Sequence, residues 1–150
     1  MNPTIVATRE LVFDKFEGQF DSQGVPMALH MQRVASGVIQ DVETILAAWL
    51  HDIVEDTKVT LQDLTDLGYS AAVTDAVYLL THVRKELTYP EYIQRLCDSE
   101  NKIALRVKIS DQTDNNDPKR WVGMNPFMKR ALNRKWFGVQ LKLEKVLEAL

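Results

Sequence analysis

The chain has 150 residues, of which 45% are hydrophobic and 26% charged, an ordinary balance for one globular domain with a hydrophobic core. Its net charge of −3 argues against general nucleic-acid binding, which needs a basic surface, but leaves room for an anionic small molecule beside a bound cation. No apolar run approaches the roughly 20 residues that span a membrane, and Cys97 is the only cysteine, which excludes an intrachain disulfide framework. We therefore expect one cytoplasmic domain over residues 1–150.

The N-terminal third of the chain shows helical patterns around one loop. Pro3 follows Asn2 and predicts a capped first helix that ends near Phe16. The next ten residues are rich in turn formers and predict a loop. The apolar spacing beyond it predicts further helices. The predicted elements are helices over about residues 3–16, 27–38 and 42–55, with a loop over residues 17–26.

The remainder of the chain continues this helical pattern. Thr60 and Asp63 form a capping-box pair that predicts a short helix ending at Gly68, and Ser70 is placed to cap the next one. Further helices are predicted from Thr88, over residues 102–116 and over about residues 125–150. No segment shows convincing strand alternation, so we predict an all-α bundle of about seven or eight helices.

The segment "AAWLHDIVEDT", residues 47–57, places several ionisable groups at the end of an apolar helix face. On a continuous helix, Asp52, Glu55 and Asp56 would share one face beside His51. A solvated acidic patch is the ordinary interpretation, but acids are unfavourable near a helix C-terminus. A bound divalent ion would supply the missing positive charge, and a His–Asp donor pair suits a first-row transition ion such as Mn or Fe.

Two adjacent ligands do not hold a metal, so other helices must contribute. His30 lies in "PMALHMQRVA" on the second predicted helix, and Asp111 interrupts an apolar face in "VKISDQTDNN". Each residue alone has an ordinary alternative, as a partly buried histidine or as a surface or capping acid. Together with His51 and Asp52 they would form a mixed nitrogen–oxygen site from three helices.

Three segments carry a resemblance to a known family. They are "GVPMALH" ending at His30, "HDIVEDT" beginning at His51, and "KISDQTDN" over residues 108–115. With them the chain resembles the HD-domain metal-dependent phosphohydrolases, and among these the RelA/SpoT-type (p)ppGpp 3′-pyrophosphohydrolases. The resemblance implies an all-α HD-domain bundle that hydrolyses the 3′-pyrophosphate of (p)ppGpp to GDP or GTP plus pyrophosphate.

The resemblance also implies a role for each matched residue. One divalent ion is expected, with Mn²⁺ first and Fe, Ni, Co or Zn as alternatives. Its implied ligands are His30, His51, Asp52 and Asp111. The implied acidic pair acting on the attacking water is Glu55 and Asp56, and Asn115 matches a residue at the nucleotide site.

The chain departs from the family pattern where that pattern is basic. Asp21 and Ser22 replace a basic pair that helps to hold the nucleotide, and an acid there is expected to repel phosphate. After Asp111 the family's R-x-H-N becomes "QTDN", which loses another cation. Two alternatives therefore stay open: an HD-type nucleotidase or triphosphohydrolase for another nucleotide, and a non-catalytic nucleotide-binding HD module.

Other polar residues receive simpler interpretations. Lys108 and Arg33 are interpreted as surface or structural cations, and His82 as an exposed or cap-proximal histidine outside the site. A weaker alternative is that the basic segment 117–137 covers the mouth of the site. The cations concerned are Lys119, Arg120, Lys129, Arg130 and Arg134. The exposed side of the last predicted helix offers a surface for a homo-oligomer.

Overall fold

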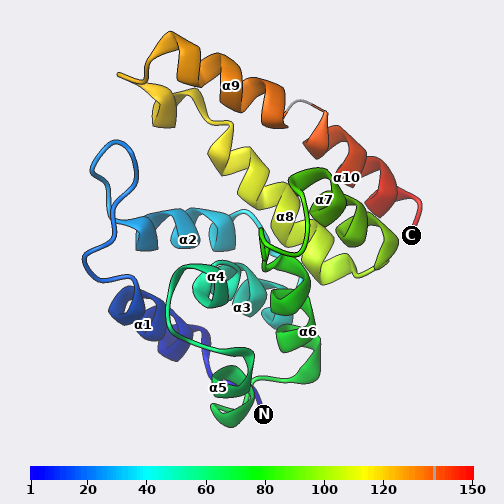
Figure 1. Cartoon of the computed structure of the whole chain (residues 1–150). Helices are drawn as coiled ribbons and strands as arrows, with labels where there is room; N and C mark the ends of the chain where they lie inside the picture. The colour runs from blue at the N-terminus through cyan, green and yellow to red at the C-terminus, as the bar shows by residue number, and fades with distance from the viewer. Residues whose placement is uncertain (137) are drawn as a thin grey trace.

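The computed structural model describes residues 1–136 and 138–150 and shows an all-α architecture, as predicted (Figure 1). Within these ranges the only β pairing is an isolated bridge between Phe20 and Pro26, and no helix is long and apolar enough to cross a membrane. Phe137, in the basic segment, lies outside the described residues. The helices are α1 (Ile5–Lys15), α2 (Met27–Ser36), α3 (Val42–Leu50), α4 (Ile53–Asp56), α5 (Leu61–Asp66), α6 (Ala71–Leu80), α7 (Tyr89–Asp98), α8 (Lys102–Asn115), the 3₁₀ helix η1 (Pro118–Trp121), α9 (Pro126–Trp136) and α10 (Val139–Glu148).

Most helix starts follow the capping signals singled out in the sequence, but α1 begins at Ile5 with Thr4 as its N-cap and not at Pro3 after Asn2. The Thr60 hydroxyl accepts from the Asp63 amide at 3.0 Å, and the Asp63 carboxylate accepts from the Thr60 amide at 2.9 Å, which completes the predicted capping box of α5. Ser70 caps α6 as expected, and Thr88 opens α7 with a second capping box. Such side chains satisfy amide groups that have no partner within the helix, so they place helix starts reliably.

The predicted third helix is wrong in its length, because it breaks at His51. The carbonyl of Ala48, which a continuing helix would pair with the amide of Asp52, accepts from the His51 backbone and from its ring Nδ1 at 2.7 Å. Asp52 leaves helical geometry, at φ −108° and ψ 2°, and α4 begins at Ile53. The acids of this segment therefore start a new turn, and the dipole argument drawn from a long helix does not apply to them.

The predicted last helix is also interrupted, at Gly138. This glycine adopts φ 77°, a left-handed conformation that residues with a Cβ rarely adopt. The apolar stripe that begins at Val139 consequently belongs to α10 alone, where Leu143 is fully buried. In Figure 1, α9 and α10 run one after the other across α8, and α10 contacts α8 and α7.

Helix α3 lies at the centre of the bundle and contacts α1, α2, α6 and α8. Its Leu46, Ala47, Ala48 and Leu50 are fully buried, and the two alanines allow neighbouring helices to approach closely. Helices α2 and α8 also contact each other. The three helices that carry the candidate ligands therefore form one packed unit.

The contact between α2 and α8 is tight at Gly37, the residue that follows α2. The Ser110 hydroxyl donates to the Val34 carbonyl at 2.8 Å. A Cβ at Gly37 would overlap the Ser110 Oγ, although the backbone of Gly37 is ordinary right-handed helix. A larger residue at this position would therefore force the Ser110 hydroxyl to move away from the Val34 carbonyl.

We predict that Gly37→Ala destabilises the fold by about 1–3 kcal/mol, the usual cost of overpacking a closely packed contact. Chemical denaturation followed by circular dichroism measures it. The Ser110→Ala background lacks the overlapping oxygen. Gly37→Ala should therefore cost less stability in that background than in the unmodified chain. Equal stability of Gly37→Ala and the unmodified chain would contradict this account of the α2–α8 contact.

Candidate metal centre and active site

The four residues expected to bind metal come together from three helices. His30 lies on α2, His51 and Asp52 form the break after α3, and Asp111 lies on α8. One nitrogen or oxygen atom of each lies within 4.8 Å of the others. His30, His51 and Asp111 are buried, and Asp52 is partly exposed. The structure brings the predicted set together, and its role as a ligand set stays a prediction.

The distances within the set fit a shared cation. His30 Nε2 lies 2.9 Å from Asp111 Oδ1 and 3.9 Å from Asp52 Oδ2. His51 Nε2 lies 3.2 Å from Asp52 Oδ2 and 3.4 Å from Asp111 Oδ1, yet this buried nitrogen has no hydrogen-bond partner among the described residues. A buried polar atom without a partner is costly, and a metal ion would satisfy it. Two imidazoles and two carboxylates are a donor set that suits Mn, Fe or similar ions.

Each imidazole is oriented by a contact at its other nitrogen. The Ala48 carbonyl can only accept, so His51 Nδ1 carries a proton, and Nε2 is the ring nitrogen directed at the site, where its lone pair would bind a metal when the ring is neutral. His30 Nδ1 lies 2.6 Å from Asp114 Oδ2, the carboxylate–histidine arrangement found behind metal ligands. Burial opposes the charge of Asp114, but hydrogen bonds from His30 and Arg33 outweigh it and lower the pKa of Asp114 to about 2.

Lys108 is buried, so of the two interpretations given to it, a surface or a structural cation, the structural one fits. Its Nζ lies 2.8 Å from Asp111 Oδ2, one turn along α8. Burial opposes the charge of Asp111, but Lys108 and the two histidines hold the pKa of this carboxyl well below its usual range. Asp111 therefore stays ionised and presents its other oxygen, Oδ1, to His30 and His51.

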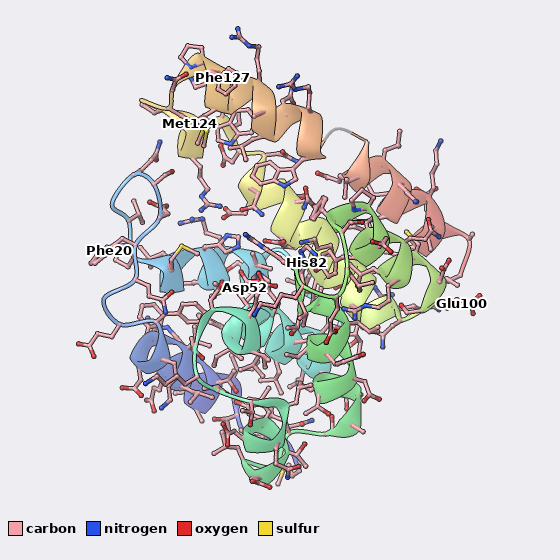
Figure 2. The ribbon with its side chains drawn as sticks, viewed as in Figure 1. Phe20, Asp52, His82, Glu100, Met124 and Phe127 are labelled. Carbon is pink, nitrogen blue, oxygen red and sulfur yellow. The ribbon has the colours of Figure 1, made fainter. Side chains whose placement is uncertain are left out.

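Three of the candidate ligands, His30, Asp52 and Asp111, line a pocket with cationic and aromatic walls, and the fully buried His51 is not among its lining residues. Figure 2 shows Asp52 and His82 near each other at the centre of the molecule, and both line this pocket. Its basic lining residues are Arg84, Lys108 and Arg120, and its ring-bearing walls include His82, Tyr89, Tyr92 and Trp136. An anion with an attached ring system matches such a lining.

The two acids of the "VEDT" segment occupy different positions. Glu55 lines the pocket, and its Oε1 accepts from the His82 amide at 2.8 Å, while burial raises its pKa. Asp56 is exposed and is not among the residues lining the pocket. Partial burial, with the charges of Asp52 and Glu55, raises the pKa of Asp56 to about 6. A second cluster is formed by carboxylate oxygens, one each from Asp52, Glu55 and Asp56, that also lie within 4.8 Å of one another. Exposed acids often cluster in this way without a metal.

Asn115 lines the pocket as expected, with partners on both sides of its amide. Its Nδ2 donates to Asp111 Oδ1 at 3.1 Å, and its Oδ1 accepts from Arg120 at 2.7 Å. Direct substrate binding by Asn115 stays a prediction.

Asp21 and Ser22 are not among the residues lining this pocket, and the expected repulsion of phosphate by Asp21 stays a prediction. Asp21 Oδ1 instead accepts from the amides of Gln23 and Val25, and Oδ2 lies 3.7 Å from Arg120 Nη2. Arg120 is also the member of the basic segment that reaches the pocket. The other cations named there, Lys119, Lys129, Arg130 and Arg134, are not among its described lining residues.

Sequence reasoning missed His82 and Asp114. His82 does lie just after α6, near the helix end as expected, but its ring stacks on Tyr92 with centroids 4.8 Å apart and lines the pocket. The Nε2 of His82 donates to the Leu87 carbonyl at 2.7 Å. No local sequence pattern predicts that the segment after α6 turns back to make this contact. Asp114 had a weak signal, since it follows Asp111 by three residues and so shares a face of α8.

No family model matches the chain, but several curated proteins are similar to it. Over 148 residues the chain is 30% identical to a guanosine-3′,5′-bis(diphosphate) 3′-pyrophosphohydrolase of Vibrio cholerae, a match covering 88% of this chain and 20% of that protein. It is 34% identical over 112 residues to the protein of the same name from Haemophilus influenzae, covering 68% of this chain and 16% of that protein. Against the bifunctional (p)ppGpp synthase/hydrolase SpoT of Escherichia coli it is 33% identical over 112 residues, with the same coverages. The chain thus spans about a fifth of the length of these relatives or less.

A solved structure shares the fold. It is that of a metazoan orthologue of SpoT described as hydrolysing ppGpp, with a TM-score of 0.64, 21% identity, and coverage of 99% of this chain and 97% of the other. This likeness supports the predicted HD-type helical fold.

We predict that Asp52→Ala weakens Mn²⁺ binding by more than the roughly 10–100-fold that loss of an outer partner of a ligand costs. Asp52 contributes an oxygen to the quartet and the negative charge nearest to His51. Isothermal titration calorimetry of the metal-free protein with Mn²⁺ measures the affinity. Asp75→Ala, which removes an exposed acid of α6, is the charge-matched control. Unchanged affinity in Asp52→Ala would remove Asp52 from the ligand set.

Proposed function

Because the chain is an HD-type domain related to the RelA/SpoT hydrolases, we propose that it is a metal-dependent phosphohydrolase acting on (p)ppGpp. The proposed reaction removes the 3′-pyrophosphate and leaves GDP or GTP. The observation that carries the proposal is the cluster of His30, His51, Asp52 and Asp111, three of which line the same pocket as Glu55. The names of the relatives support this choice of substrate.

We propose one Mn²⁺ held by these four residues, with Fe, Ni, Co or Zn as alternatives that the same donors accept. When bound, such an ion lowers the pKa of a coordinated water and polarises a phosphoryl oxygen. The protein holds the ligands in place for this purpose through Ala48 behind His51 and Asp114 behind His30.

Glu55 is the side chain best placed to handle a proton in this pocket. The His82 amide fixes one of its oxygens, and partial desolvation raises its pKa, so it is a stronger proton acceptor than a fully solvated glutamate. In the proposed hydrolysis the bond between the ribose 3′ oxygen and phosphorus breaks. The hydroxyl of water ends on the departing pyrophosphate, and the remaining proton ends on the 3′ oxygen. Asp56 lies next to Glu55 outside the lining and is proposed to assist it electrostatically.

The cations that line the pocket would attract an anionic substrate. Arg84 is exposed at the pocket, and Lys108 and Arg120 line it. However, Lys108 pairs with Asp111, and Arg120 pairs with Asp114. Because two of the three cations are already paired with acids of the protein, the pocket would neutralise fewer phosphate charges. This observation favours a nucleotide of lower charge as the second candidate substrate.

Other properties stay predictions. A cytoplasmic location and the absence of nucleic-acid partners rest on the composition, and a homo-oligomer rests on the exposed face of α10 that carries Leu141. A non-catalytic module is disfavoured because such a protein has no need for Glu55 beside the ligand set.

We predict that the Mn²⁺-loaded protein converts ppGpp to GDP and pyrophosphate, and that the metal-free protein does not. Ion-exchange chromatography of the products, against a panel of nucleoside mono-, di- and triphosphates, measures the preference. Release of guanosine 3′-diphosphate 5′-monophosphate would show cleavage at the 5′ side and contradict the proposed reaction. Cleavage of a panel nucleotide alone would select the second candidate.

We predict that Glu55→Gln with Asp56→Asn keeps Mn²⁺ affinity within a few fold and lowers kcat by about 10²–10⁴-fold, the range expected for loss of general base catalysis. Both substitutions keep side-chain shape and remove the proton-accepting charge. Glu55→Gln alone should account for most of the loss, since Glu55 lines the pocket and Asp56 does not. Glu10→Gln, which changes an exposed acid of α1, is the control. Full turnover in the double variant would show that these roles are wrong.

A further inference from the structure

Arg120 reaches the site from η1, beyond the end of α8. Only 19% of its side chain is exposed, although the 3₁₀ helix that carries it lies at the surface. Its Nη1 donates to Asn115 Oδ1 at 2.7 Å and to Asp114 Oδ2 at 3.1 Å, and its Nη2 lies 3.7 Å from Asp21 Oδ2. Its Nη1 also lies 3.3 Å from His30 Nδ1, so one guanidinium contacts four polar groups from three parts of the chain.

Two of these groups stand directly behind candidate metal ligands. Asp114 Oδ2 accepts from His30 Nδ1 at 2.6 Å, and Asn115 Nδ2 donates to Asp111 Oδ1 at 3.1 Å. Arg120 therefore contacts the hydrogen-bond partners of both a nitrogen ligand, His30, and an oxygen ligand, Asp111. Such outer contacts fix the rotamer and basicity of the ligand that they touch.

The third group ties the 17–26 loop to the same place. Asp21 caps turns of this loop by accepting from the Gln23 and Val25 amides, and Gln23 Nε2 donates to the Val122 carbonyl at 2.7 Å. In Figure 1 the loop between α1 and α2 extends toward the segment that follows α8. The side chain of Asp21 thereby points its second oxygen at Arg120 instead of at the pocket.

The charges of this network balance. Asp21 and Asp114 are mostly buried carboxylates, and Arg33 and Arg120 are the cations beside them. Buried charge without a partner is costly, so the two acids need both arginines. A residue that at first sight only weakens the site for phosphate, Asp21, thus gains a specific partner.

We propose that Arg120 is a positioning residue of the metal centre. It orients His30 through Asp114 and Asp111 through Asn115, and it anchors the 17–26 loop through Asp21. The inference rests on the proposed metal site but not on the identity of the substrate. Asp21 then organises the site and does not contact the nucleotide.

The first test is Mn²⁺ affinity by calorimetry. Arg120→Ala should weaken binding by about 10–100-fold, as expected for loss of an outer partner of a ligand, and Arg120→Lys should recover part of it by keeping one charged contact. Lys119→Ala, the exposed neighbour on η1, should match the unmodified chain. Arg120→Ala in the Asp114→Asn background should cost less than in the original chain, because the two residues act through one contact.

The second test needs no metal. Long-range ¹H–¹⁵N spectra of the metal-free protein report the imidazoles of His30, His51 and His82, the chain's three histidines. Arg120→Ala should shift the His30 signals and leave those of His82 unchanged, and Arg120→Lys should reverse part of the shift. Unshifted His30 signals would overturn the proposal even if the protein bound no metal and hydrolysed no ppGpp.

The third test separates positioning from substrate binding. Asp21→Asn keeps the oxygen that caps the loop, and Asp21→Lys restores a family-like cation. The proposal expects Asp21→Lys to weaken Mn²⁺ binding, because the lysine repels Arg120, and not to lower the KM for ppGpp. The Mn²⁺ affinity of Asp21→Asn should lie between those of Asp21→Lys and the unmodified chain. Unchanged Mn²⁺ affinity in Arg120→Ala together with a higher KM would make Arg120 a substrate cation and overturn the proposal.

Discussion

The convergence of His30, His51, Asp52 and Asp111 is the constraint on which the rest of the structure depends. Burial opposes the ionised form of both carboxyls, so each needs positive charge within a few ångströms. Lys108 supplies part of it to Asp111, and the histidines supply the rest, but His51 Nε2 keeps no hydrogen bond of its own. A divalent ion at this point would satisfy the nitrogen and both carboxylates at once.

The helices that carry these residues pack directly against one another. Helix α2 lies close to α8 at Gly37, and the break after α3 places His51 and Asp52 beside His30 and Asp111. The break is part of the site, since the proton on His51 Nδ1 that ends the helix also fixes the ring for metal binding. One hydrogen bond therefore links the local structure to the proposed chemistry.

Local patterns predicted the all-α class, the helix starts and the candidate ligands. Capping residues such as Thr60 and Thr88 act over three residues, and the spacing in "HDIVEDT" is equally local. The helix break at His51 depends on a side chain competing for the Ala48 carbonyl, and the break at Gly138 on a single positive φ, which periodicity does not reveal. The burial of Lys108 and the contact of Asp21 with Arg120 depend on partners distant in sequence or on packing, so they could not be predicted from composition.

The most direct test of the account is a crystal structure of the Mn²⁺-loaded protein with anomalous diffraction measured at the manganese edge. The account predicts one anomalous peak per chain, in contact with His30 Nε2, His51 Nε2 and carboxylate oxygens of Asp52 and Asp111. A peak held by Glu55 and Asp56 in place of the two histidines, or no peak in this pocket, would contradict it.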